Sequence, residues 1–197
     1  MFRTAYWRPF YLFVCGKLGN FKESSNEAEN DVSEIVIQTD AKPEDLIPQL
    51  HAILDPTEPP VTTMANVASL FYWSLDAVNW VGFYILDDDA LRLGPFHGKP
   101  ACTILALEEG VCAAAVREKR MMNIPDVLSF DGHIACDPAS RSELVVPILV
   151  HGEVWGVLDI DSPVHKRFSL VDERLFTEAA ALIGAHLEAW KGRIFPA

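Results

Sequence analysis

The apolar and polar positions of the chain follow two different periods. Between residues 43 and 76 the apolar positions recur at helical spacing, which predicts two amphipathic helices. The first begins at Lys42-Pro43-Glu44-Asp45, with a proline and two acids in its first turn, and Asp55-Pro56 and Pro59-Pro60 end it. The second helix is predicted over about Val61–Asp76.

From Asn79 onward the apolar segments are shorter, aromatic and β-branched, which favours strands. Asp87-Asp88-Asp89 and His151-Gly152 are turn signals, and each lies between two such segments, so two hairpins are predicted. The predicted strands are Asn79–Leu86, Leu91–Phe96, about Ala101–Leu107, Ser142–Val150 and Val154–Ile160.

Two further helices complete the pattern. An Ala-rich segment after Gly110, VCAAAVREK, predicts a short helix. The last helix begins at Ser169, a favourable N-cap residue, and Asp172 is placed to complete a capping box. The chain is therefore expected to adopt an α+β fold, in which a mostly antiparallel sheet of about six strands packs against N- and C-terminal helices.

The first 40 residues differ in composition from the rest. Residues 22–40 are polar and acidic and are interpreted as a linker, so an N-terminal extension (1–40) is expected to precede one domain over residues 41–190. The first stretch holds Arg3, Arg8 and Lys17 and no acid before Glu23, a composition found in mitochondrial presequences. It is poor in serine and interrupted by proline, so an extension without a targeting role is the alternative.

Composition and charge exclude several classes of protein. Half of the 197 residues are hydrophobic, which predicts a packed core rather than disorder. The net charge of −12 argues against binding to nucleic acid or to an anionic membrane through a basic surface. No segment approaches the roughly 20 apolar residues that span a bilayer.

The four cysteines are Cys15, Cys102, Cys112 and Cys136. Their spacing contains no CxxC pair and no Cys/His set typical of zinc, so no metal is expected. The chain is also too large, and its cysteines too sparse, for a secreted disulfide scaffold, which favours the cytoplasm. Cys112 follows Val111 and precedes three alanines, so an inert, buried thiol is one interpretation of it.

Cys136 lies in the predicted loop DGHIACDPASRSE (131–143) and has the surroundings of a reactive thiol. The backbone amides around Ile134 and Ala135 are candidates for stabilising an anion. A protonated His133 would lower the pKa of the thiol, whereas the neighbouring acids Asp131 and Asp137 would raise it. The sequence leaves open which of these effects is larger.

Three acids form a second candidate group. Asp159 and Asp161 point to the same face of a predicted strand, because the side-chain period of a strand is two. Glu143 begins the preceding strand, so hairpin pairing would bring it close to Asp161. Clustered carboxylates repel one another, and one of them is expected to hold its proton near neutral pH and to serve as a general acid. The alternative is a solvated strand end or a hydrogen bond to a loop amide.

Trp80 and Tyr84 fall on one face of the strand NWVGFYIL, with Val81 and Phe83 on the other. Aromatic residues in strands most often belong to the core. A wall beside a ligand is the second interpretation.

Six motifs, taken together in their order and spacing, are more specific than any one of these features. They are NWVGFYIL, LGPFHGKPAC, GVCAAAV, IPDV, GHIACDPASRSELVVPI and GVLDIDSP. In these motifs the chain closely resembles the free methionine-(R)-sulfoxide reductases, GAF-fold enzymes that reduce free rather than protein-bound methionine-(R)-sulfoxide. The match covers roughly Pro43 to Leu187, so the resemblance implies a GAF-like catalytic domain and leaves the N-terminal extension unexplained.

The resemblance implies a role for each matching residue. Cys136 matches the nucleophile, Cys102 the resolving cysteine that forms a disulfide with it, and Cys112 an accessory or alternative resolving cysteine. The acids Glu143, Asp159 and Asp161 match the groups that bind the substrate and activate its sulfoxide. The other implied or candidate substrate contacts are Asp126, a further pocket acid, the aromatic wall of Trp80 and Tyr84, and the amides around Ile134 and Ala135.

The resemblance also implies thioredoxin as the reductant and no cofactor, and it leaves a homodimer open. Reduction would leave a sulfenic acid on the nucleophilic cysteine, which a second thiol converts to a disulfide. Two alternatives come from another functional class: a GAF-type module that binds a small ligand without turnover, and a redox sensor that switches through the Cys136–Cys102 disulfide.

Overall fold

The computed structural model describes residues 11–12, 35–36, 43–132 and 137–190. Cys15, and the loop residues Ile134, Ala135 and Cys136, lie outside the described residues. A separate antiparallel pair, β1 (Tyr11–Leu12) with β2 (Ile35–Val36), falls within the predicted extension. The domain boundary at residue 40 stays a prediction. In the described part of the chain, no helix is long and apolar enough to cross a membrane.

The sheet has six strands in the order β5-β4-β3-β8-β7-β6, and every neighbouring pair is antiparallel. The predicted α+β fold with about six strands is therefore confirmed. The strands are β3 (Trp80–Asp87), β4 (Ala90–Gly98), β5 (Ile104–Ala106), β6 (Met122–Ile124), β7 (Ser142–Val150) and β8 (Glu153–Ser162).

Three strands differ in length from their predictions; β4 runs from Ala90 to Gly98 rather than from Leu91 to Phe96. β5 pairs with β4 only from Arg92↔Ile104 to Ala90↔Ala106, so it is shorter than the predicted 101–107. The chain before it runs through Pro100, which has no amide to donate to a neighbouring strand. β8 continues to Ser162 instead of ending at Ile160, because its pairing with β7 extends to Ser142↔Ser162.

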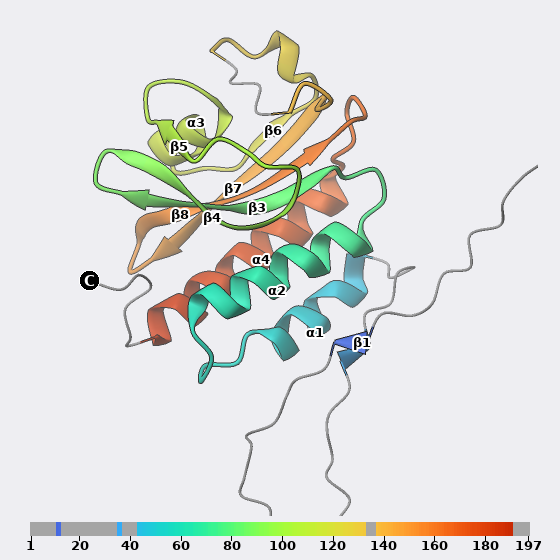
Figure 1. Cartoon of the computed structure of the whole chain (residues 1–197), viewed down its shortest axis with the longest axis vertical. Helices are drawn as coiled ribbons and strands as arrows, with labels where there is room; N and C mark the ends of the chain where they lie inside the picture. The colour runs from blue at the N-terminus through green and yellow to red at the C-terminus, as the bar shows by residue number, and fades with distance from the viewer. Residues whose placement is uncertain (1–10, 13–34, 37–42, 133–136, 191–197) are drawn as a thin grey trace, which may run out of the picture.

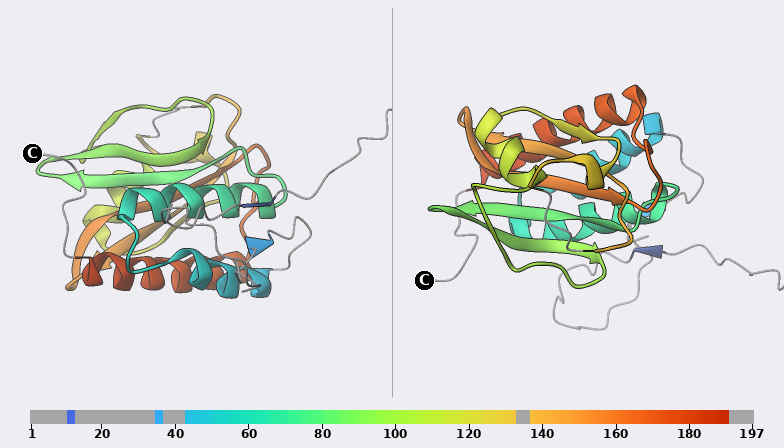
Figure 2. Two further views of the ribbon diagram at one scale, coloured as in Figure 1. Left: turned by 60° about the horizontal axis from the view of Figure 1, so that its bottom comes forward. Right: turned by 90° about the horizontal axis from the view of Figure 1, so that it is seen from above.

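Helices cover both faces of the sheet, as Figures 1 and 2 show from three directions. The helices α1 (Pro43–Ile53), α2 (Pro60–Ser74) and α4 (Leu170–Ala189) lie on one face, and the short α3 (Val111–Glu118) lies on the other. A 3₁₀ turn, η1 (Val127–Ser129), follows β6.

The two faces of β3 belong to two different cores. Val81 and Phe83 pack with α1, α2 and α4 in the larger core. Trp80 and Tyr84 pack with α3 in the smaller core, where Cys112 is also buried. The predicted division of this strand into two faces is confirmed, and because both faces are covered, nearly all of β3 is buried.

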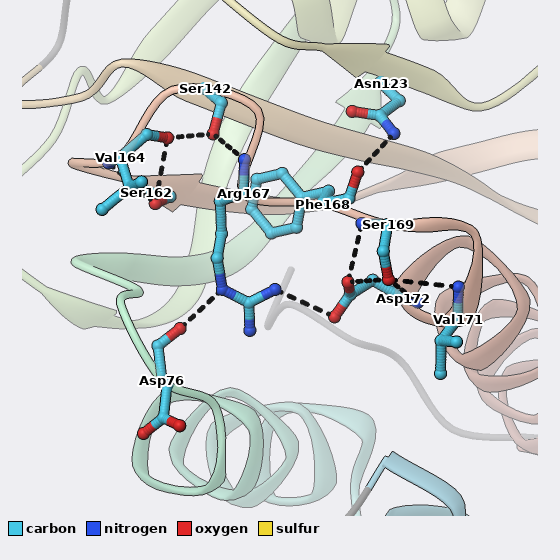
Figure 3. A network of polar contacts seen from close by, with 10 residues as sticks. All are labelled: Asp76, Asn123, Ser142, Ser162, Val164, Arg167, Phe168, Ser169, Val171 and Asp172. Atoms are coloured by element: carbon cyan, nitrogen blue, oxygen red, sulfur yellow. Dashed lines mark hydrogen bonds and ion pairs between the residues drawn. The ribbon is translucent and has the colours of Figure 1, made fainter.

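The start of α4 is fixed by the capping box predicted from Ser169 and Asp172. The Ser169 Oγ accepts hydrogen bonds from the Val171 and Asp172 amides, and the Asp172 Oδ2 accepts one from the Ser169 amide at 2.8 Å. Arg167 donates to the Asp172 carboxylate and, from its Nε, to the Asp76 carbonyl at 2.7 Å (Figure 3). This network ties the region after α2 to the start of α4.

The same network holds the first residue of β7. The Ser142 Oγ donates to the Val164 carbonyl at 2.6 Å and accepts from the Arg167 amide at 3.3 Å (Figure 3). Ser142 is completely buried. Glu143, the next residue in the strand, is thereby held at a fixed position on the opposite face of the sheet, beneath α3.

Candidate active site

A cavity lies between α3 and the face of the sheet that carries Trp80 and Tyr84. Its walls come from β3, β5, β7, β8, the segment after β4, the start of α3 and the segment that precedes β7. The described residues that line it are Trp80, Tyr84, Lys99, Pro100, Ala101, Leu105, Glu109, Gly110, Val111, Cys112, Asp137, Ser140, Glu143, Asp159 and Asp161. Six of the predicted site residues are thus brought together: Trp80, Tyr84, Cys112, Glu143, Asp159 and Asp161.

Trp80 forms the aromatic side of the cavity. Its ring stacks on Tyr84 at 5.9 Å and on Phe96 at 5.4 Å between centroids. The indole Nε1 donates to the Lys99 carbonyl at 3.1 Å, and the Tyr84 hydroxyl donates to the Cys102 carbonyl at 3.0 Å. Trp80 and Tyr84 therefore belong to the smaller core and also line the cavity. Both interpretations of the sequence, core residues and a wall beside a ligand site, are compatible with their positions.

Gly82, between the two aromatics, is a residue that sequence reasoning missed. It lies on the same face as Trp80 and Tyr84, and a Cβ built on it would lie 2.4 Å from Cη2 of Trp80 and 2.4 Å from Cβ of Phe96. Any side chain here would push the indole away. The sequence did contain an indication of this close contact, because in WVGFY a glycine lies between two aromatic residues on the same face of the strand.

The three acids converge as the hairpin predicted. Glu143 on β7 pairs directly with Asp161 on β8, and Asp159 is two residues further along the same face. Glu143 and Asp159 are both only 6% exposed. The alternative of a solvated strand end is wrong, because α3 and the neighbouring loops cover this part of the sheet.

Burial makes these carboxyls hold their protons. It raises the pKa of Asp161 to about 7, against a partial lowering by a hydrogen bond with Ser140. Burial, followed by the negative charges of Asp159 and Asp161, raises the pKa of Glu143 well above its usual range. Burial and the charge of Asp161 do the same to the pKa of Asp159. The cavity therefore contains proton donors at neutral pH.

Cys112 is buried, and it also lines the cavity beside the acids. Burial raises the pKa of its thiol well above the usual range, and the charges of Asp159 and Glu143 raise it further. A thiol in this state is a poor nucleophile. Its Sγ and one oxygen each of Glu143 and Asp159 all lie within 4.8 Å of one another, a spacing that a metal ion can bridge.

Cys102 and Asp126 are not among the described residues that line the cavity. Cys102 is partly buried in the smaller core and contacts the site through its carbonyl, which accepts the Tyr84 hydroxyl. Asp126 caps η1, where its carboxylate accepts the Leu128 amide at 3.1 Å. The roles predicted for Cys136, Ile134 and Ala135 lie outside the described residues.

Asp137, the residue after Cys136, is held at the cavity by residues that the sequence did not single out. Its carboxylate accepts hydrogen bonds from the Ala139 amide at 2.9 Å and from Asn79 Nδ2 at 3.2 Å, and it pairs with Lys99 at 3.2 Å. The Ala139 amide, and then Lys99, lower the pKa of Asp137. Asp137 is therefore ionised, and Lys99 compensates its charge. No local sequence pattern predicts this ion pair, because Lys99 and Asp137 are 38 residues apart.

Comparison with known proteins places this site in a family. The GAF domain family matches residues 61–187. The chain is 47% identical over 137 residues to Protein YtsP of Bacillus subtilis, covering 68% of this chain and 84% of that protein. It is 51% identical over 114 residues to the free methionine-R-sulfoxide reductase of Escherichia coli, covering 58% of this chain and 69% of that protein.

A solved structure agrees with these sequence matches. The free methionine-R-sulfoxide reductase from Neisseria meningitidis, solved in complex with its substrate, is 35% identical and superposes with a TM-score of 0.71, over 75% of this chain and 89% of that one. The six-stranded antiparallel sheet with helices on both faces is thus a GAF fold. With the acids, the aromatic pair and Cys112 on one face of that fold, the chain belongs to the GAF-domain family of free methionine-R-sulfoxide reductases.

Proposed function

We propose that this protein reduces free L-methionine-(R)-sulfoxide to L-methionine, with Cys136 as the nucleophile. The observation that carries the proposal is the buried group of three acids beside Trp80, in a chain of this family. A sulfoxide is a poor electrophile until its oxygen is protonated or strongly hydrogen-bonded. A cavity with protonated carboxyls at neutral pH supplies that activation.

Asp161 and Glu143 serve as the proton donors in this proposal. With a pKa of about 7, Asp161 keeps its proton in about half of the molecules at neutral pH. Glu143 is its direct strand partner, so a proton can be shared between the two carboxyls. The Trp80 ring provides a flat apolar surface for the methyl group on the substrate sulfur.

Two electrons pass from Cys136 to the substrate sulfur. The thiolate attacks the activated sulfoxide, the oxygen is transferred from the substrate sulfur to the Cys136 sulfur as the substrate S–O bond breaks, and methionine leaves with a sulfenic acid formed on Cys136. A second thiol then attacks the sulfenic sulfur, forming a disulfide and releasing water. Cys102 is the expected resolving thiol, with Cys112 as the alternative. Thioredoxin returns two electrons by thiol–disulfide exchange, which requires a reducing compartment such as the cytoplasm.

The charge of the cavity suits a free amino acid. Of the described residues that line it, five are acids and Lys99 is the one cation, itself paired with Asp137. The ammonium group of a free amino acid needs a counter-charge, and Asp159 would supply it by releasing its proton when the ammonium binds. A methionine within a polypeptide has no such ammonium group and could not enter a cavity covered by α3.

The assay that tests the proposal follows NADPH oxidation with thioredoxin, thioredoxin reductase and each epimer of free methionine sulfoxide. Turnover is expected with the R epimer and not with the S epimer. Equal rates for both epimers, or no turnover, would contradict the proposal. Binding of the sulfoxide without turnover would favour the non-catalytic GAF-type sensor instead. Cys136→Ser serves as the control, since oxygen cannot replace the sulfur nucleophile.

A further inference from the structure

We propose that the reduced protein binds one Zn²⁺ ion at Cys112, Glu143 and Asp159, and that the bound ion excludes the substrate. The three ligands come from α3, β7 and β8 and are all buried. Binding does not depend on the proposed function, whereas the inhibition that it causes does.

The positions of the three side chains carry the proposal. The Cys112 Sγ and the two carboxylate oxygens all lie within 4.8 Å of one another. Around a tetrahedral zinc ion, with bonds of about 2.1 Å to oxygen and about 2.3 Å to sulfur, neighbouring ligand atoms are about 3.5 Å apart. Shifts of about 1 Å, within reach of side-chain rotation, would close the three atoms around an ion.

A second observation at the proposed zinc site is a buried oxygen atom of Asp159 that lacks a hydrogen-bond partner. The Asp159 side chain is hydrogen-bonded to Cys112 and Glu143, but its buried Oδ1 has no hydrogen-bond partner among the described residues. A buried carboxylate oxygen without a partner costs free energy, and a cation bound there would remove that cost. This orphaned oxygen belongs to one of the three proposed ligands.

The chemistry of the ligands selects the ion. Mg²⁺ and Ca²⁺ prefer sets made only of oxygen, whereas a thiolate with two carboxylates suits Zn²⁺ and other borderline cations. Three protein ligands leave the fourth position open toward the cavity, for water or a small anion. Metal binding would displace the protons that burial keeps on Cys112, Glu143 and Asp159.

The same groups serve the proposed reaction, so a bound ion and the substrate compete. Zinc would occupy the acids that activate the sulfoxide and would hold Cys112 as a thiolate. Oxidation of Cys112 to a disulfide would remove one ligand, so the oxidised protein should bind the ion more weakly.

The test uses Co²⁺ as an optical substitute for Zn²⁺ in the full-length, fully reduced protein. We expect one equivalent of Co²⁺ to give a thiolate-to-metal charge-transfer band, which Zn²⁺ abolishes by displacement. Cys112→Ala should lose the band and bind Zn²⁺ at least about tenfold more weakly. Asp159→Asn should weaken binding by a similar factor. A variant in which Cys15, Cys102 and Cys136 are all serine, leaving Cys112 alone, should keep the band.

A band that persists in Cys112→Ala would overturn the proposal, and so would loss of the band in the variant that keeps only Cys112 while circular dichroism shows that variant folded. Should that variant not fold, the Asp159→Asn titration decides, and unchanged affinity there would refute the site. Inhibition is measured as methionine released in a single turnover, without thioredoxin, with and without one equivalent of Zn²⁺. Metal binding without any turnover would refute the proposed function alone; turnover without metal binding would refute this inference alone.

Discussion

Glu143 on β7 and Asp161 on β8 are direct partners across the antiparallel ladder. Their side chains therefore share one face of the sheet, and that face is covered by α3. Two acids at such positions on an exposed sheet would be ordinary ionised groups. Here they share a buried cavity, so burial favours the protonated forms of both, and the negative charges of Asp159 and Asp161 favour it further for Glu143.

Removing the carboxyl of Asp161 should remove the proton donor. In Asp161→Asn the amide keeps the size and polarity of the side chain but cannot transfer a proton to the sulfoxide. We expect kcat to fall about 10²- to 10⁴-fold with a smaller change in KM. Steady-state kinetics with the R epimer measure this. Glu178→Gln, on the exposed part of α4, is the matched control and should be neutral. A kcat close to wild type in Asp161→Asn would assign the donor elsewhere.

Stability should fall as the pH rises toward neutrality. A carboxyl whose pKa is raised from 3.8 to about 7 on folding binds more protons in the folded than in the unfolded state within that window. The contribution of Asp161 to the free energy of unfolding therefore decreases as the pH rises through the window and levels off above it. Urea unfolding at several values between about pH 5 and about pH 8 measures this slope.

Asp161→Asn provides the comparison, because the amide does not titrate. Its unfolding free energy should depend less on pH than that of the wild-type protein over the same range. Parallel curves for the two proteins would show that Asp161 is already ionised near pH 5 in the folded state.

Gly82→Ala should disturb the aromatic wall. The new Cβ would lie 2.4 Å from the Trp80 ring, so the indole must move. We expect a loss of about 1–3 kcal/mol in stability together with an increased KM. Gly152→Ala is a useful comparison: its φ of 81° makes alanine unfavourable, but nothing lies within 4 Å of the new Cβ. That variant should lose stability without a change in KM. An unchanged KM in Gly82→Ala would mean that the Trp80 ring does not contact the substrate.

The resolving thiol can be identified by comparing Cys102→Ser with Cys112→Ser. If Cys102 resolves the sulfenic acid, Cys102→Ser should release about one methionine per enzyme in a burst and then stall with thioredoxin. Cys112→Ser should continue to turn over, because its thiol has a raised pKa and attacks slowly. Quenched-flow measurement of methionine distinguishes the two. A stall in Cys112→Ser with normal rates in Cys102→Ser would reverse the assignment.

Local pattern predicted the elements and the faces of this fold well. The capping box of Ser169 and Asp172 and the two faces of β3 depend on residues a few positions apart, and both are as predicted. The pairing of Glu143 with Asp161 followed from a hairpin with a short turn, which fixes its own register. Such features need only the periods of the helix and the strand.

Other parts of the site depend on segments far apart in the chain. Lys99 and Asn79 hold Asp137 through contacts that span 38 and 58 residues, and no spacing rule anticipates them. Asp126 matches a family motif, yet the structure uses its carboxylate to cap η1. The role of Gly82 became clear only once the Trp80 ring was seen to lie across it.

The sequence by itself determined the four helices of the domain and five of the six strands of its sheet, the face of β3 that each residue occupies, and which family motifs the chain carries. Only the tertiary structure decided that α3 covers the acids, and with it the burial that raises their pKa values and places Cys112 among them. The physical reason is that the two kinds of effect act over different separations along the chain. Backbone periodicity acts over a few residues, whereas desolvation and charge repulsion depend on everything that packs around a group, whatever its position in the chain.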